Sequence, residues 1–454
     1  MIMKTTFTRV VLLAVALFAP AAWAKVNIEH WTQPGGAKVY LVQSHSLPMV
    51  DVQIDFDAGS RRDPADKAGL AGVTAAMASR GLLADGGDPA LDENGLSEAW
   101  ADLGASFGAS ASADRMGFSL RSLTYPDLLP KVVALAARQL ALPAFAPDIW
   151  QREREQLVAS IKEADTRPAT IASKAFATAV YGAHPYGYQM TEASLGRIDV
   201  AAMRSLYARA IEPCRAKVSI VGDVSRAQAD ELVGALLARL QQGRCKDALP
   251  AVAEVAPMAQ PGATQAIAFD SAQAHVLIGQ PGIRRNDPDF LALTVGNYVL
   301  GGGGFVSRLM SQVREKRGLS YSVYSYFAPG LHAGAFTVGL QTRPDQARQA
   351  VAVTREVVAQ FVAQGPTAQE LQAAKSNLIG GFALRLDSNR KLLDNLSNIA
   401  WNDLALDYLD TWTAAVERLT VDDVRQASAR VLRPQDMVTV VVGGETRHGS
   451  EWNA

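Results

Sequence analysis

Alternating apolar and polar side chains predict half-buried β-strands at two distant places in the chain, residues 113–124 and 334–342. Apolar residues at helical spacing follow each strand, over 127–140 and 344–363. The same order of strand and helix therefore occurs twice, which favours a duplicated unit.

The same patterns predict further elements in each half. They are strands over 50–58 and 276–281, and helices over 149–164, 226–240 and 367–384.

Similarity between two stretches of the amino-acid sequence supports the duplication. RIDVAAMRSLYARAIEPCRAKVSIVGDV begins at Arg197 and RLTVDDVRQASARVLRPQDMVTVVVGGE begins at Arg418, 221 residues later (197 to 418), and Pro213 aligns with Pro434. Each stretch is typical of a helix that ends near proline, followed by an apolar strand that ends in glycine. A spacing this long is expected of duplicated domains rather than of a solenoid of short repeats.

The fold class expected from these patterns is α+β, with two tandem homologous layered domains. Because strands follow one another directly, we expect antiparallel sheets, each with helices packed on one face. The predicted domains span 25–240 and 266–454. A stretch with several glycines and prolines, residues 241–265, is the predicted linker between them.

The charge and the metal-binding residue types narrow the function classes. Lys and Arg number 44 and Asp and Glu number 45, so no basic excess points to nucleic acid as a partner. The histidine pair that lies closest in sequence, His30 and His45, is too widely spaced for a local metal motif. The two cysteines, Cys214 and Cys245, leave open whether they are bridged.

The first 24 residues are predicted to be a secretory signal peptide. Lys4 and Arg9 precede and border a short apolar run, residues 10–18, and Ala-Trp-Ala at 22–24 is a cleavage-site pattern. No later apolar run is long enough to span a membrane, which needs about 20 residues. A periplasmic location is the expectation.

The segment GGGGFVSRLMSQVREKRGLSYSVYS, residues 301–325, strongly resembles the C-terminal half of the insulinase/pitrilysin family of zinc peptidases. GSRRDPADKAGLAGVTAAM, AHPYGY and IVGDV, which begin at 59, 183 and 220, lie where that family has similar segments. The resemblance covers essentially the whole chain after residue 24. It implies the duplicated α+β architecture that the repeats predict independently.

One departure from the family pattern changes the expected chemistry. Family peptidases carry His-x-x-Glu-His on a helix, where two histidines one turn apart bind zinc and the glutamate activates water. This chain has Gly72, Ala75 and Ala76 at those positions, and Ser160 at the position of the later glutamate ligand. The resemblance therefore implies a degenerate zinc site, with no metal and no cofactor in this chain.

The second half keeps the pair of residues that the family uses to bind substrate and stabilise the oxyanion. Arg314 and Tyr321 have the family's spacing of seven. An amphipathic helix is expected over 305–317, with a left-handed cap at Gly318 and a strand from Tyr321. A guanidinium on the last turn and a phenol on the next strand could converge on one carbonyl oxygen.

Neighbouring residues are expected to be structural. Lys316 and Arg317 are predicted surface charges, and Tyr324 and Tyr326 are predicted to pack. The glycines at 301–304 lack the lysine of a phosphate-binding loop and are expected to pack closely or form a hinge. His184 is expected to make a structural hydrogen bond.

The resemblance implies a zinc-less subunit of a two-chain periplasmic peptidase. A partner subunit would bring His-x-x-Glu-His and zinc, and this chain would bring Arg314 and Tyr321 to the peptide substrate. The alternative is a non-catalytic peptide-binding or structural subunit.

Overall fold

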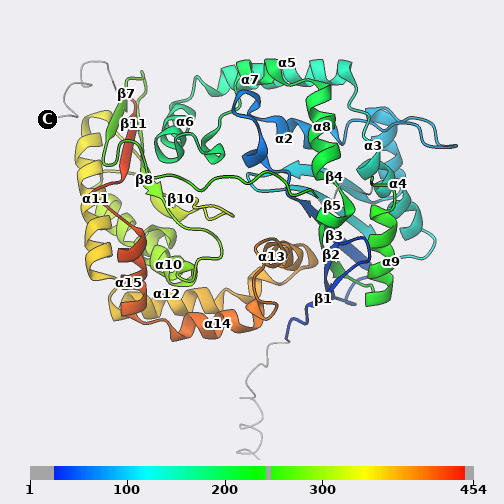
Figure 1. Ribbon diagram of the computed structural model, residues 1–454. Helices are drawn as coiled ribbons and strands as arrows, with labels where there is room; N and C mark the ends of the chain where they lie inside the picture. The colour runs from blue at the N-terminus through cyan, green and yellow to red at the C-terminus, as the bar shows by residue number, and fades with distance from the viewer. Residues whose placement is uncertain (1–24, 242–246, 445–454) are drawn as a thin grey trace, which may run out of the picture.

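The computed structural model describes residues 25–241 and 247–444 and contains two β-sheets, one in each half of the chain (Figure 1). The predicted signal peptide, residues 1–24, lies outside the described residues. Cys214 is disulfide-bonded, and Cys245 lies outside the described residues. Among the described residues, no helix is long and apolar enough to cross a membrane.

The first sheet has six strands in the order β1-β2-β6-β3-β5-β4. All neighbouring pairs are antiparallel except β2 with β6. The strands are β1 (Glu29–Thr32), β2 (Lys38–Gln43), β3 (Met49–Phe56), β4 (Ser106–Ala111), β5 (Met116–Leu123) and β6 (Lys217–Gly222).

The second sheet has five strands in the order β7-β11-β8-β10-β9 and repeats this plan. Its single parallel pair, β7 with β11, corresponds to β2 with β6. The strands are β7 (Thr264–Ile267), β8 (Ala274–Pro281), β9 (Val323–Phe327), β10 (Ala335–Thr342) and β11 (Val438–Val442).

Helices of the same half cover one face of each sheet, as predicted. In the first half these are α2 (Leu70–Met77), α3 (Glu93–Asp102), α4 (Leu129–Ala141), α5 (Pro147–Ala164), α7 (Glu192–Arg197), α8 (Val200–Ala210) and α9 (Arg226–Leu237). In the second half they are α10 (Phe290–Asn297), α11 (Ala347–Gln364), α12 (Ala368–Gly380), α14 (Tyr408–Arg418) and α15 (Val421–Val431).

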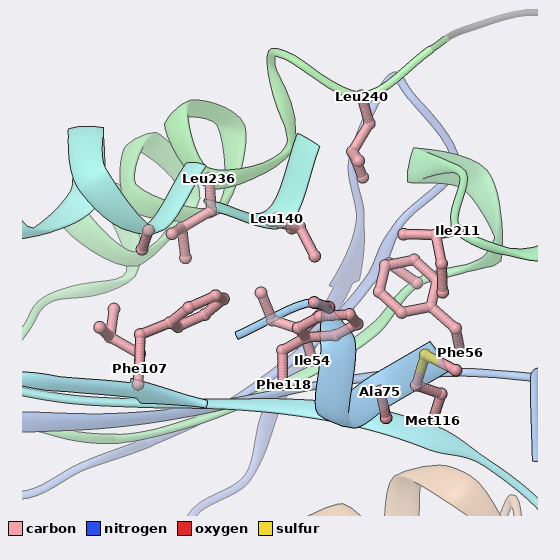
Figure 2. Close-up of a cluster of buried hydrophobic side chains, with 14 of the residues drawn as sticks. Ile54, Phe56, Ala75, Phe107, Met116, Phe118, Leu140, Ile211, Leu236 and Leu240 are labelled. Atoms are coloured by element: carbon pink, nitrogen blue, oxygen red, sulfur yellow. The ribbon is translucent and has the colours of Figure 1, made fainter. Parts of the chain in front are cut away.

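Alternate strand residues form the core beneath these helices. In the first half, Ile54, Phe56 and Phe118 belong to one buried cluster with Leu140 of α4 and Leu236 of α9, and Phe56 lies beside Ile211 (Figure 2). The rings of Phe56 and Phe118 meet edge to face at 5.9 Å between centroids. The other residues of the same strands face the opposite side of the sheet.

The opposite face of each sheet is covered by a helix from the other half of the chain, which the sequence analysis did not predict. Helix α6 (Pro168–Tyr181) packs on β8 and β11 of the second sheet, and α13 (Asn389–Trp401) packs on β3 and β6 of the first (Figure 1). The two helices begin 221 residues apart (168 to 389), so they are equivalent members of the repeat.

The two crossed interfaces differ in chemistry. Phe176 of α6 lies over Gly279 of β8, where a Cβ would come within 2.7 Å of its ring. Under α13, Ser397 donates a hydrogen bond to Asp55 at 2.8 Å, and Arg115 pairs with the same carboxylate at 2.8 Å. Each of α6 and α13 thus packs on the half of the chain to which it does not belong. The domain boundaries at 25–240 and 266–454 stay a prediction.

We expect the crossed helices to make the two halves unfold together. Phe176→Ala should lower the free energy of unfolding by about 3–5 kcal/mol, because it removes a buried ring from between the halves. Urea unfolding followed by circular dichroism should show one transition for the wild-type protein and one for Phe176→Ala. Ser173→Ala, at an exposed position on the same helix, should change the free energy by less than about 0.5 kcal/mol. Two separate transitions, one of them unchanged by Phe176→Ala, would contradict the expectation.

Candidate functional site: a degenerate metal position and an arginine–tyrosine pair

Helix α2 carries three of the four positions at which family ligands or the base are missing. It begins after Gly69, whose φ of +102° favours glycine. The carboxylate of Asp63 accepts hydrogen bonds from the backbone N–H groups of Gly69 and Ala71, both at 2.9 Å. Burial raises the pKa of Asp63 to about 7, although these hydrogen bonds act to lower it. The Asp63 carboxylate therefore helps to fix the start of α2.

The side chains at the three positions on α2 have no atom that can bind a metal. Gly72 and Ala76 lie one turn apart, and a Cβ at Gly72 would meet no atom within 4 Å. Ala75 is 1% exposed and belongs to the hydrophobic core (Figure 2). A glutamate base at Ala75 would now be buried among apolar groups.

The fourth position, Ser160, is exposed on α5. The nearby Glu155 and Glu163 are also exposed, and Glu163 pairs with Arg167, the residue that precedes α6. Over residues 25–241 and 247–444, no group of three or more histidine, cysteine, aspartate or glutamate side chains could hold a metal. A serine hydroxyl and three apolar positions do not fit zinc, which takes thiolate, imidazole and carboxylate ligands.

Ion pairs join the helices around this position. Arg80, just beyond α2, pairs with Glu93 of α3 and with Glu153 of α5, the latter at 3.2 Å. Arg152 of α5 also pairs with Glu93, at 2.6 Å. These partly exposed pairs contribute about 0–1 kcal/mol each, so their main effect is to fix how the three helices meet.

The segment that leads to Arg314 is built differently from the expected helix over 305–317. A 3₁₀ turn (Gly304–Val306) is followed by a π-helix (Met310–Glu315), in which the Lys316 N–H donates to the Ser311 carbonyl at 3.0 Å. The helix prediction was wrong here because the backbone of Ser307 is extended, with φ of −79° and ψ of 156°, which separates the turn from the helical residues that follow. A second π-helix (Tyr298–Gly302) lies just upstream. π-Helices are rare and occur frequently at functional sites.

The structure brings Arg314 and Tyr321 together. Gly318 has φ of +62° and donates its N–H to the Arg314 carbonyl at 2.8 Å, which reverses the chain as predicted. The Arg314 guanidinium carbon lies 5.2 Å from the centroid of the Tyr321 ring. No carboxylate among the described residues pairs with this guanidinium. Its N–H groups therefore lack an anionic partner within the described part of the chain.

The charged and aromatic neighbours lie mainly where they were expected. Lys316 and Arg317 are exposed, and Arg317 bonds to Gln312. Tyr324 and Tyr326 stack on each other at 6.1 Å between ring centroids. Both remain half-exposed on β9, so packing accounts for only part of their surface.

The first three glycines of the run 301–304 pack closely, which is one of the two expected roles. A Cβ at Gly301 would lie 2.4 Å from Ser325 Oγ, and a Cβ at Gly303 would lie 2.6 Å from the Tyr298 carbonyl oxygen. These glycines let the segment pass directly against β9. Their role is steric, with no sign of a phosphate cradle.

His184 makes structural hydrogen bonds, as predicted. Its Nδ1 accepts from the Tyr186 N–H at 3.1 Å, so Nε2 carries the proton and donates to the Ala253 carbonyl at 3.1 Å. Burial, and then the nearby His332, lower the pKa of His184. The neutral ring thereby fastens the predicted linker to the first half.

Sequence reasoning missed a polar cluster between the two halves. Tyr186 donates its hydroxyl to Asp114, which also accepts from the Leu331 N–H at 2.9 Å. His332 bonds through Nδ1 to Glu254 of the linker at 2.7 Å. These residues come from four distant segments, and no local motif could have indicated that they meet.

Two family models match consecutive parts of the chain. The family model described as insulinase (peptidase family M16) matches residues 38–194, and the model described as peptidase M16 inactive domain matches residues 197–378. A crystal structure of a peptidase M16 inactive domain from Pseudomonas fluorescens is 33% identical, with a TM-score of 0.86, and the match covers 93% of this chain and 99% of that one. The chain belongs to peptidase family M16.

Other proteins are similar at lower identity. An uncharacterized zinc protease of Streptomyces coelicolor is 29% identical over 299 residues, or 64% of each chain. The non-peptidase homolog YmxG of Helicobacter pylori is 24% identical and covers 90% of this chain and 93% of its own. The periplasmic protease PqqL of Escherichia coli shares the fold at a TM-score of 0.78 and 18% identity, over 92% of this chain and 46% of that one.

The M16 positions on α2 and α5 predict how the purified chain responds to zinc. The wild-type protein should retain no stoichiometric zinc after gel filtration, because Gly72, Ala76 and Ser160 provide no adequate ligand set. The variant that combines Gly72→His, Ala76→His and Ser160→Glu should bind more zinc by elemental analysis. About one tightly held zinc per wild-type chain would contradict the degenerate site.

The core position of Ala75 predicts a cost for restoring the base. Ala75→Glu should lower the free energy of unfolding by at least about 2 kcal/mol, because the carboxyl group would be buried without a partner. Ala76→Glu, one residue away and exposed, should change it by less than about 0.5 kcal/mol. Urea denaturation of both variants measures the difference. Equal stability of the two would show that Ala75 is not held in the core.

Proposed function

We propose that this chain is the zinc-less subunit of a heteromeric M16 metallopeptidase in the periplasm. A partner subunit of the same family would carry His-x-x-Glu-His and the zinc ion. This chain would supply Arg314 and Tyr321 to the bound peptide. The signal peptide predicted over residues 1–24 is the basis for the proposed location.

The observation that carries the proposal is the contrast between the two halves. In the first half the ligand and base positions hold Gly72, Ala75, Ala76 and Ser160, which do not bind zinc. In the second half the Arg314 guanidinium lies against the Tyr321 ring and has no carboxylate partner among the described residues. This contrast is what we would expect of a subunit that contributes only the arginine and tyrosine to a shared peptidase site.

The chemistry available to the pair is electrostatic stabilisation. When water attacks a peptide carbonyl, negative charge develops on its oxygen. A guanidinium and a phenolic hydroxyl can each donate a hydrogen bond to that oxygen, and the guanidinium adds its charge. Neither group needs to exchange a proton for this role. The zinc chemistry itself would belong to the partner.

The length of one structural neighbour is consistent with a site made from two such units. The match to PqqL covers 92% of this chain and only 46% of that one, so PqqL is about twice as long. PqqL, a periplasmic protease, therefore joins a unit of this fold to a second stretch of similar length. In the proposed complex the second stretch is a separate chain.

A non-catalytic peptide-binding or structural role is the second candidate. Its support is the name of the Helicobacter pylori relative, a non-peptidase homolog, together with the burial of Ala75 in the core. In that case Arg314 and Tyr321 would contribute to a binding surface without affecting a rate. Kinetics separate the two candidates.

The test is peptide cleavage by a reconstituted pair. The chain is mixed with an M16 subunit that carries His-x-x-Glu-His, and complex formation is followed by size-exclusion chromatography. Arg314→Ala and Tyr321→Phe should each lower kcat/KM by about 10²–10³-fold, the usual loss for one oxyanion donor. The matched control Arg317→Ala removes an exposed charge from the same turn and should change kcat/KM by less than about fivefold.

The outcomes distinguish the proposals. If the complex forms and both Arg314→Ala and Tyr321→Phe cleave at the wild-type rate, the catalytic contribution is refuted and the non-catalytic candidate is favoured. If the chain alone cleaves peptides in a zinc-dependent manner, both proposals fail.

A further inference from the structure

The three most exposed large hydrophobic side chains of the described residues lie in one segment. They are Phe305 at 67%, Val306 at 76% and Tyr321 at 82% exposed. Single exposed apolar residues are normal on protein surfaces, whereas several gathered together indicate a site of use. Here Phe305 and Tyr321 both contact the same cation.

The Arg314 guanidinium contacts both aromatic rings. Its central carbon lies 4.9 Å from the centroid of the Phe305 ring and 5.2 Å from that of Tyr321. Both distances are within the range of about 6 Å at which a cation is attracted to an aromatic ring. Ring contacts leave the N–H groups of a guanidinium free to donate hydrogen bonds.

Local backbone structure brings Phe305 to this place. Gly304 has φ of +62°, and a Cβ there would meet no atom within 4 Å, so its conformation rather than crowding requires glycine. Buried Ser307 closes the turn, since its hydroxyl donates to the Gly304 carbonyl at 2.8 Å and its N–H to the same oxygen at 3.0 Å. The turn therefore sets the direction in which Phe305 leaves the backbone.

We propose that Phe305 is a positioning residue that, with Tyr321, holds the Arg314 guanidinium in the orientation that presents its N–H groups to a peptide carbonyl. The inference rests on the proposed function of Arg314. Burial in the core cannot explain Phe305, because two thirds of its surface is exposed. Hydrogen bonding cannot hold the guanidinium either, because Arg314 has no side-chain hydrogen bond among the described residues.

Val306 provides a matched control. It is the next residue in the same 3₁₀ turn and is at least as exposed as Phe305, but it has no ring and no contact with the cation. Removing either side chain should leave the fold intact. Only Phe305→Ala should change the environment of Arg314.

The first measurement uses the isolated chain and needs no partner. An aromatic ring shifts the NMR signals of groups next to its face, so the side-chain Nε–H and δ-methylene signals of Arg314 should move in Phe305→Ala and stay in place in Val306→Ala. Arg314→Lys assigns these signals by their loss. Arg314 signals that do not change in Phe305→Ala would overturn the inference, whatever the activity of the complex.

The second measurement is cleavage by the reconstituted pair. Phe305→Ala should lower kcat by about 2- to 5-fold, the change in population expected from one exposed cation–π contact, with a smaller change in KM. Phe305→Tyr should cleave at the wild-type rate, because it keeps the ring. Phe305→Leu, which lacks a ring, should be as slow as Phe305→Ala. Val306→Ala should cleave at the wild-type rate.

The two failures can be told apart. If Arg314→Ala leaves the rate unchanged, the proposed function fails while the NMR result still decides whether Phe305 holds the guanidinium. If Arg314→Ala slows cleavage and Phe305→Ala or Phe305→Leu does not, Arg314 acts without the help of Phe305 and the inference is overturned.

Discussion

The packing of α6 and α13 across the two halves is the constraint on which the rest of this structure depends. A sheet whose second face carries apolar residues needs a cover on that face. Here the cover for each sheet comes from the other half of the chain, at equivalent points of the repeat. Neither half is therefore complete by itself, and the exchange fixes where the Arg314 segment stands relative to α2.

The two crossed interfaces stabilise this arrangement in different ways. The contact of Phe176 with Gly279 is a steric fit between apolar groups. The contact of Ser397 and Arg115 with Asp55 is polar, and burial raises the pKa of Asp55 even though Arg115 acts to lower it. Desolvation offsets much of the energy of such a buried pair, but its directional hydrogen bonds require one alignment of α13 on the sheet.

What the sequence could predict depended on the range of the interactions. Strands and helices with strong periodicity were predicted to within a few residues, as for β10 (Ala335–Thr342) and α11 (Ala347–Gln364). Helix α6 was missed because it is rich in small residues and its partner sheet lies about a hundred residues later. The pairing of Arg314 and Tyr321 was implied by the resemblance to the family, and the short spacing with one capping glycine between them agrees with it.

The form of the Arg314 segment was not predictable from periodicity. Leu309, Met310 and Val313 are buried as an α-helix would bury them, so the apolar pattern alone does not distinguish a π-helix. Val306 lies within the range of the expected amphipathic helix and is exposed, because the turn after Gly304 directs it outward. The cluster of Asp114, Tyr186 and His332 depends on contacts between distant segments, which no local pattern records.

The two halves also differ in what they leave on the surface. At the degenerate position, Ala75 is part of the core and Arg80 is paired with acidic side chains, so little there remains to act on another molecule. At the other position, Phe305 and Tyr321 leave most of their apolar surface in water around a guanidinium without a carboxylate partner among the described residues. That exposure gives up the stabilisation that burying two rings would provide. An arrangement that forgoes this stability is better explained by a molecule that binds there than by the folding of the chain.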